Sequence, residues 1–307
     1  MAIWLQIHDA PRVINEGKVV IDINRQTPDT IYFKEFMKFV REQITLDEYA
    51  EKIIVPVGLS PLNQVMFMDL NDSTPHILVA GTSGSGKSVS LNSIVLSMMC
   101  MYSEQMLKFV FIDPKQVEFN IYNGARHTER FFTDVEDTAD YLEQVVKLMD
   151  ERYKEISQVN VRNINAYNKR LREDGHPEKQ MHRLLIVFDE FADFMKHDDK
   201  DMVKRITDST QRLLQKSRAA GIHLIICTQS PKADVINTNL RNNLAGRICL
   251  RVSDSNASSV VIDEPGAEQL AGKGDYLMRG NNNRLERGMS PFLDDDTLYG
   301  LLSYFKN

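Results

Sequence analysis

The chain has 307 residues, of which 42% are hydrophobic and 26% charged, and its formal net charge is −6. This balance is ordinary for a globular protein, and it excludes a disordered chain and a protein that coats nucleic acid with its whole surface. The cysteines Cys100, Cys227 and Cys249 show no CxxC spacing, so they indicate no zinc site or disulfide framework and favour a reducing cytoplasm. No apolar run approaches the roughly 18 residues of a spanning helix, so we expect no signal peptide and no direct membrane insertion.

Residues 1–72 are predicted to form a small N-terminal α/β or β-rich subdomain. Short β-branched or alternating stretches lie at 19–23, 53–59 and 65–70, and each is bounded by Gly, Pro, Asn or Asp. Residues 32–52 between them have a helical pattern. The boundary to the next domain is expected at residue 72.

Residues 73–307 are predicted to form an α/β domain with a mainly parallel central sheet flanked by helices. Apolar strands alternate with longer amphipathic stretches, which is the pattern of βαβ units. Residues 138–156 show one apolar helical face, whereas 160–180 and the charged run 197–201 are expected to be loops or solvated faces. The expected strands are HILVA before Gly81, FVFI before Asp113, LLIVF before Asp189, IHLIIC before Thr228 and RICLRV from Arg247.

The run GTSGSGKS at residues 81–88, called the P-loop below, matches the phosphate-binding pattern G-x-x-x-x-G-K-[ST]. An apolar strand precedes it and a helix-compatible run follows it, as the mechanism requires. Lys87 is expected to reach the β- and γ-phosphates of ATP, and the Ser88 hydroxyl to hold Mg²⁺. The expected ATP-binding residues are Gly81, Thr82, Ser83, Gly84, Ser85, Gly86, Lys87, Ser88 and Val89.

Two carboxylates, Asp189 and Glu190, follow the apolar run LLIVF. Ligands of open α/β sheets bind at the carboxyl ends of the strands, where these side chains would emerge. We expect Asp189 to coordinate Mg²⁺ and Glu190 to polarise the attacking water. Gln229, which follows the strand IHLIIC, is expected to sense the γ-phosphate.

These residues resemble the motor domain of the FtsK/SpoIIIE family of double-stranded DNA translocases, over about Val19 to Phe292. The combination of IDPK, RAAGIH and GAE…GKGD is the most specific part of the resemblance. The stretches that carry it are PHILVAGTSGSGKSVSLN, FIDPKQVEF, ERYKEISQVNVRNINAYN, VFDEFADFM, KSRAAGIHLIICTQSP and PGAEQLAGKGDYLMR.

The resemblance implies a RecA-like P-loop ATPase that assembles into a hexameric ring, with DNA in the pore and ATP between subunits. Such interfaces use an arginine that reaches the neighbour's γ-phosphate, because a guanidinium neutralises charge on the transferring group. Arg247 lies at the family's finger-like position, and Arg218 and Arg241 are the alternatives.

The loop after the strand RICLRV departs from the family pattern, because Ser255 and Ser259 stand where relatives carry basic residues. Phosphate contacts supply most of the non-specific affinity for DNA, so this change would weaken binding. Lys273 could supply the missing charge. The expected DNA contacts are therefore Ser255, Ser259 and Lys273. Ser230, between Gln229 and Pro231, replaces another arginine of the family pattern.

The sequence as a whole predicts an ATP-driven motor that moves double-stranded DNA, with a nuclease or a membrane-anchored protein as a further partner. It also fits a motor fragment of a longer protein, or a compact relative encoded by a mobile element or defence system. One alternative is a related ring ATPase of specialised protein secretion that moves polypeptide. A second alternative is a nucleotide-gated interaction subunit with little turnover.

Overall fold

The computed structural model describes residues 12–15, 19–22, 30–45 and 52–306. It divides the chain into two compact units, residues 1–31 and 32–307. In the first unit, β1 (Arg12–Asn15) and β2 (Val19–Asp22) form an antiparallel two-stranded sheet.

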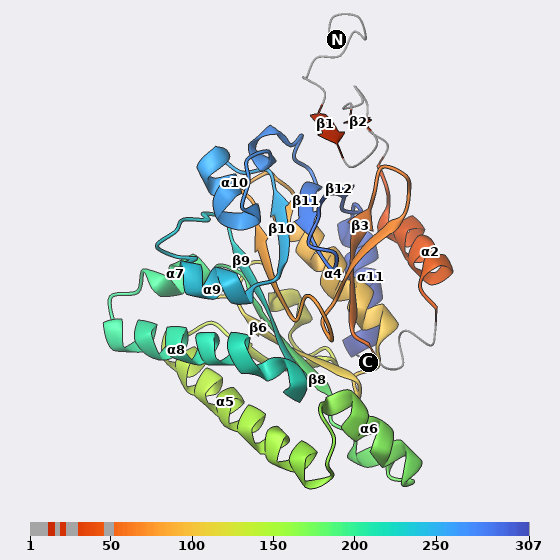
Figure 1. Cartoon of the computed structure of the whole chain (residues 1–307), viewed down its shortest axis with the longest axis vertical. Helices are drawn as coiled ribbons and strands as arrows, with labels where there is room; N and C mark the ends of the chain where they lie inside the picture. Colours follow the sequence, from red (N-terminus) through yellow and green to blue (C-terminus); the bar gives the residue numbers. More distant parts are fainter. Residues whose placement is uncertain (1–11, 16–18, 23–29, 46–51, 307) are drawn as a thin grey trace, which may run out of the picture. The chain divides into compact units, whose positions relative to one another are not determined.

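The second unit is built on a ten-stranded sheet with the order β4-β3-β12-β11-β10-β5-β9-β8-β6-β7 (Figure 1). The six strands from β10 to β7 in this order run parallel, and the other four extend the sheet in antiparallel pairs. The parallel strands are β10 (Gly246–Leu250), β5 (His76–Ala80), β9 (Ile222–Thr228), β8 (Arg183–Phe188), β6 (Leu107–Ile112) and β7 (Thr128–Phe132). The antiparallel strands are β11 (Asp275–Arg279), β12 (Leu285–Met289), β3 (Ile54–Leu59) and β4 (Val65–Asp69). The predicted mixed α/β fold with a mostly parallel sheet is therefore confirmed.

The central strands β5, β8 and β9 are buried along their whole length. In β8, Ile186 and Phe188 pack into one core cluster, whereas Leu185 and Val187 pack into the other. A strand buried on both faces gains nothing from polar residues at alternate positions, which explains its continuous apolar sequence.

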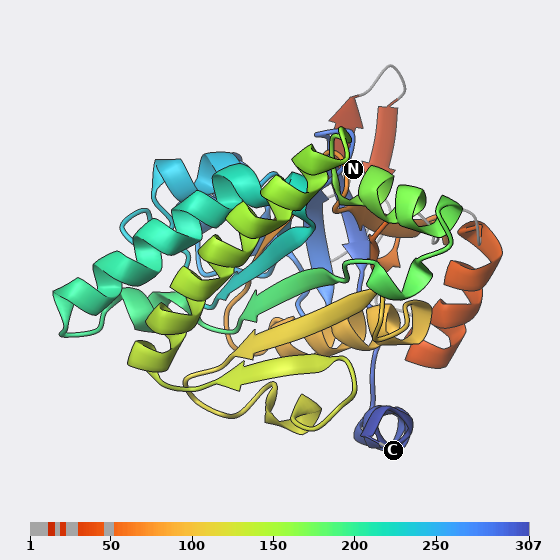
Figure 2. The same ribbon diagram turned by 90° about the horizontal axis from the view of Figure 1, so that it is seen from below.

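Helices cover both faces of this sheet (Figure 2). One core cluster contains residues of α4 (Lys87–Met101) and α11 (Asp295–Lys306). The other contains residues of α5 (Val135–Gln158) and α8 (Lys200–Lys216). The remaining helices are α2 (Phe33–Gln43), α6 (Ile164–Glu173), α7 (Phe191–Met195), α9 (Thr238–Asn243) and α10 (Ser255–Ile262), with the 3₁₀ turns η1 (Asn120–Tyr122), η2 (Pro177–Lys179), η3 (Ser217–Ala220) and η4 (Ala267–Gln269). Among the helices of the described ranges, none is both long and apolar enough to cross a membrane.

The structure adds detail to three sequence-based expectations. The expected loop 160–180 contains α6, whose N-cap Asn163 accepts a 3.0 Å bond from the Ala166 N–H. This helix was missed because it buries little beyond Ile164 and Asn168, which leaves a weak apolar pattern. The run 197–201 is exposed throughout, as expected for a loop or solvated face, and within it Asp199 caps α8. The compact unit begins at Tyr32, and β3 and β4 pair into the ten-stranded sheet, whereas the expected domain boundary at residue 72 stays a prediction.

Candidate nucleotide-binding site

The P-loop joins the end of β5 to the start of α4, at the carboxyl edge of the parallel strands. The Gly81 N–H donates to the Thr228 carbonyl at 3.2 Å, and the Ser85 N–H donates to the Thr82 carbonyl at 3.1 Å. Gly86 has a φ of 96°, a left-handed conformation that a side chain would strain, and α4 begins at the next residue. The turn therefore leads directly into a helix N-terminus, where backbone N–H groups favour phosphate.

Lys87 and Asp189 form a buried ion pair with 2.9 Å between Nζ and Oδ1. Their side chains are only 4% and 3% exposed. Burial alone would lower the pKa of Lys87, but the neighbouring Cys227 thiol and the Asp189 carboxylate raise it above its ordinary value. The ammonium therefore stays charged beside the P-loop, as an interaction with phosphate requires.

Glu190 is held at the same edge of the sheet by the last residue of β9 and by the residue that follows it. The Thr228 hydroxyl donates to Oε1 at 2.7 Å, and the Gln229 backbone N–H donates to Oε2 at 2.7 Å. These bonds fix the orientation of a carboxylate that is 4% exposed. The Gln229 side chain is exposed, so its backbone orients Glu190 while its amide remains accessible.

Ser88 lies in the first turn of α4, and its hydroxyl donates to the carboxylate of Glu118 in the loop after β6. Asp113 closes this loop by accepting bonds of 2.9–3.1 Å from four backbone N–H groups, those of Lys115, Gln116, Glu118 and Phe119. The Lys115 ammonium pairs with Asp193 at 2.9 Å. The sequence pattern indicated no role for Asp113, Lys115 or Glu118, although they lie in the stretch FIDPKQVEF that carries part of the resemblance.

Lys273 lies beside the P-loop. The N–H of Gly274 donates to the Ser85 carbonyl at 2.8 Å, and a Cβ added to Gly86 would lie 2.4 Å from the Gly274 nitrogen. The P-loop is also bonded to the residue that follows β10, because both the N–H and the hydroxyl of Thr82 donate to the Arg251 carbonyl at 3.0 Å. The loop 271–275 and Arg251 are thus both hydrogen-bonded to the P-loop. The sequence did not predict either contact.

Ser255 and Ser259 lie on α10, which follows Arg251 and is capped by Asp254. The Ser259 hydroxyl donates to the Ser255 carbonyl at 2.8 Å, one turn earlier in the helix. Ser255 is exposed and Ser259 partly exposed. Their role as DNA contacts stays a prediction.

Arg247 is 8% exposed and bonded inside its own chain. It donates to the carbonyls of Leu244, Val261 and Arg241 at 3.0–3.3 Å, and it pairs with the Asp263 carboxylate. Burial lowers the pKa of its guanidinium, whereas Asp263 opposes that shift. This is the environment of a structural arginine. Arg247 could reach the γ-phosphate of a neighbouring subunit only if these bonds broke.

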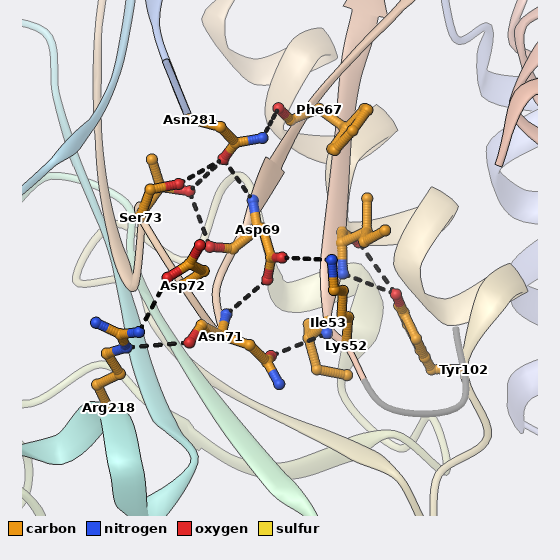
Figure 3. A network of polar contacts seen from close by, with 12 residues as sticks. Lys52, Ile53, Phe67, Asp69, Asn71, Asp72, Ser73, Tyr102, Arg218 and Asn281 are labelled. Carbon is orange, nitrogen blue, oxygen red and sulfur yellow. Dashed lines mark hydrogen bonds and ion pairs between the residues drawn. The ribbon is translucent and has the colours of Figure 1, made fainter. Parts of the chain in front are cut away.

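Arg218 and Arg241 are less enclosed. Arg218 donates to the Asn71 carbonyl at 3.0 Å and to Asp72 at 3.2 Å, in the turn between β4 and β5 (Figure 3). Asn281 bonds to the same turn, where its amide oxygen accepts from the Ser73 hydroxyl at 3.1 Å, and also to the end of β4, where it accepts from the Asp69 N–H at 3.0 Å. The side chains of Arg218 and Arg241 are 51% and 28% exposed. Arg247 and Arg218 lie toward the N-terminal ends of the parallel strands, opposite the P-loop of their own chain.

The residues present fit a magnesium ion held together with a nucleotide. Within the described ranges, no three His, Cys, Asp or Glu residues converge on one metal position. Mg²⁺ is usually bound by one or two carboxylates together with substrate phosphates and water, rather than by a cage of protein ligands. The Ser88 hydroxyl, next to Lys87 in the chain, and the Asp189 carboxylate, which pairs with Lys87, are oxygen groups of this kind.

A model of the FtsK/SpoIIIE family matches residues 40–233. The DNA translocase FtsK of Agrobacterium fabrum is 32% identical over 96% of this chain and 35% of its own length. The DNA translocase SpoIIIE of Bacillus subtilis is 36% identical over 91% of this chain and 36% of its own length. The chain thus spans about a third of the length of these curated relatives.

Two solved structures are similar over most of the chain. The pCW3 conjugation coupling protein TcpA, solved as a monomer with ATPγS, has a TM-score of 0.75 and 27% identity, covering 95% of this chain and 80% of TcpA. The cytoplasmic domain of the type VII secretion ATPase EccC of Thermomonospora curvata has a TM-score of 0.70 and 25% identity, covering 82% of this chain and 31% of EccC.

Proposed function

Because the chain belongs to the FtsK/SpoIIIE family, we propose that it hydrolyses Mg²⁺-ATP to move double-stranded DNA. The observation that carries this proposal is the Glu190 carboxylate, oriented by Thr228 and Gln229 beside the buried pair of Lys87 and Asp189. The names of the FtsK and SpoIIIE relatives support DNA as the substrate, and the ATPγS in the TcpA structure supports ATP.

Each residue of the site has a separate task in the proposed hydrolysis. The P-loop N–H groups bind the phosphates, and the Lys87 ammonium moves from Asp189 toward the β- and γ-phosphate oxygens. Ser88 and Asp189 hold Mg²⁺, which neutralises charge on the phosphates. Glu190 orients the attacking water and accepts its proton, while the exposed Gln229 amide senses the γ-phosphate.

We further propose that the site is completed in a hexameric ring by an arginine from the neighbouring subunit. A guanidinium stabilises the charge that spreads over the transferring phosphoryl group. Arg247 stays the residue suggested by family position, but Arg218 and Arg241 would give up fewer buried bonds on moving.

The bonds from Thr82 to Arg251 support a route from ATP to DNA. Arg251 precedes α10, so a shift of the P-loop would be transmitted to the segment that carries Ser255 and Ser259. Lys273 is fixed against the P-loop through Gly274. In this proposal these three residues face DNA phosphates, which position the duplex without reading its sequence.

Measurement of ATP turnover tests the proposal and separates it from the alternatives. Turnover should rise several-fold with long linear duplex DNA, fall as salt is added, and collapse in Lys87→Ala and Glu190→Gln. Stimulation by an exported peptide but not by DNA would instead favour the polypeptide motor suggested by the EccC likeness. Nucleotide binding with negligible turnover under all these conditions would favour the interaction subunit.

A further inference from the structure

Glu118, in the loop between β6 and η1, faces the metal-binding end of the P-loop. We propose that Glu118 is a positioning residue for the metal of Mg²⁺-ATP: its carboxylate accepts a hydrogen bond from the Ser88 hydroxyl, which leaves the hydroxyl lone pairs free for the metal. The inference rests on the proposed use of Mg²⁺-ATP and adds a residue from outside the motifs that predicted the site.

The chemistry of a hydroxyl explains why its proton needs a partner. A serine hydroxyl has one donor hydrogen and two acceptor lone pairs. A metal takes a lone pair, so the hydrogen must point elsewhere. Ser88 directs it to the Glu118 carboxylate, and a charged acceptor makes the stronger type of hydrogen bond.

The position of Glu118 is fixed by its backbone and by its neighbour. Its N–H donates to Asp113 at 3.0 Å, and the N–H of Phe119 donates to the same carboxylate oxygen at 3.1 Å. Phe119 is fully buried, and its ring stacks 5.0 Å from that of Phe111 in β6. The loop is therefore held without the Glu118 side chain, which is free to act on Ser88.

The charges around the site also favour a divalent cation. Asp189 pairs with Lys87 at 2.9 Å, Glu190 follows Asp189 in the chain, and Glu118 accepts a hydrogen bond from the residue after Lys87. Three carboxylates thus lie near one ammonium. The nearby Lys115 does not balance them alone, since it is already paired with Asp193 at 2.9 Å. A bound divalent cation would offset the excess negative charge.

The experiment measures Mn²⁺ affinity by electron paramagnetic resonance, with ATPγS bound to the full chain. Glu118→Ala should weaken Mn²⁺ binding about 10- to 100-fold, the range found when partners of metal ligands are removed. Glu118→Gln keeps an acceptor oxygen and should lose less. Binding of a fluorescent ADP in EDTA should be unchanged in both, because the loop does not depend on this side chain. Val117→Ala, an exposed change in the same loop, is the matched control.

A double-variant cycle tests whether Glu118 acts through Ser88. In a Ser88→Ala background, Glu118→Ala should add little further loss of Mn²⁺ affinity. Wild-type Mn²⁺ affinity in Glu118→Ala, a full additive loss in the double variant, or an equal loss of ADP binding in EDTA would each overturn the inference. A wild-type protein that binds ATPγS without any metal dependence would overturn the proposed Mg²⁺-ATP site itself.

Discussion

The backbone N–H of Gly274 donates a 2.8 Å hydrogen bond to the carbonyl of Ser85, so the loop 271–275 is fixed directly on the P-loop. Asp275 holds this loop in place. It is 2% exposed, accepts two hydrogen bonds of 2.7–2.9 Å from Arg287, and accepts the Ala271 N–H at 2.8 Å. The P-loop conformation therefore depends on residues about 190 positions away in the sequence, which short-range motif arguments do not reach.

Gly274→Ala should weaken nucleotide binding although Gly274 lies outside the phosphate-binding motif. Its φ of 97° strains any side chain, and the new Cβ would lie 3.3 Å from the Ser290 carbonyl oxygen. The strain alone should cost about 1–3 kcal/mol of unfolding free energy. Gly175→Ala is the control, because it has a φ of 82° and open space around the added Cβ. Equal nucleotide affinities of the two variants, measured by titration, would contradict this coupling.

Thr228→Val should slow hydrolysis without changing ATP affinity. The substitution removes the hydroxyl that donates to Glu190 and leaves the P-loop untouched. Because a positioned general base contributes about 10²–10⁴-fold, partial loss of its orientation should lower kcat by about 10-fold or more. Thr210→Val in α8 is the matched control, since its buried hydroxyl has no hydrogen-bond partner within the described structure. A Thr228→Val enzyme with normal kcat would show that Glu190 needs no such support.

Arg247→Ala should destabilise the fold by about 3 kcal/mol or more, because each hydrogen bond of a charged group contributes about 1.5–3 kcal/mol and several are lost. Arg218→Ala, which removes a half-exposed pair, should change the unfolding free energy by less than about 1 kcal/mol. Urea unfolding measures both effects.

Mixed rings separate this structural role from a catalytic one. Subunits carrying Arg247→Ala, Arg241→Ala or Arg218→Ala are each mixed with Lys87→Ala subunits. Restored ATP turnover identifies the arginine that completes the neighbour's site. If Arg247 is structural only, its mixture with Lys87→Ala should show no more turnover than expected from the separate variants.

The buried histidine His223 should make the fold sensitive to acid. Burial lowers its pKa to about 3, with Arg183 and Arg152 adding to the effect against the bond to the Pro75 carbonyl. In the unfolded chain, His223 is protonated below about pH 6.5. In the folded chain, it is protonated only below about pH 3. Stability is therefore lost as the pH falls through this window.

His223→Asn keeps a donor toward Pro75 and removes the titrating group. Between pH 4 and 6, its unfolding free energy should fall less steeply than that of the wild type, by about 1.4 kcal/mol per pH unit. His76, whose pKa is lowered mainly by burial, should keep part of the slope in the variant. Urea titrations at several pH values measure both slopes, and identical slopes would contradict the prediction.

The parts of the site that follow a strand could be predicted from the sequence. The P-loop, Asp189 with Glu190, and Gln229 each come directly after an apolar run, and parallel strands bring their carboxyl ends to one edge. Glu118 could not be assigned, since its contact with Ser88 depends on how Asp113 folds the intervening loop. The place of Lys273 beside the P-loop could not be foreseen either, because the contact is made by backbone atoms that leave no side-chain pattern.

The bonds from Thr82 end on the main-chain carbonyl of Arg251, a group that every amino acid possesses. Replacement of the residues that follow, including the serines at 255 and 259, leaves this carbonyl in place. The charge and size of the α10 side chains can therefore change while the hydrogen bonds from Thr82 to this carbonyl are kept. The same phosphate-binding turn can thus be combined with different α10 segments.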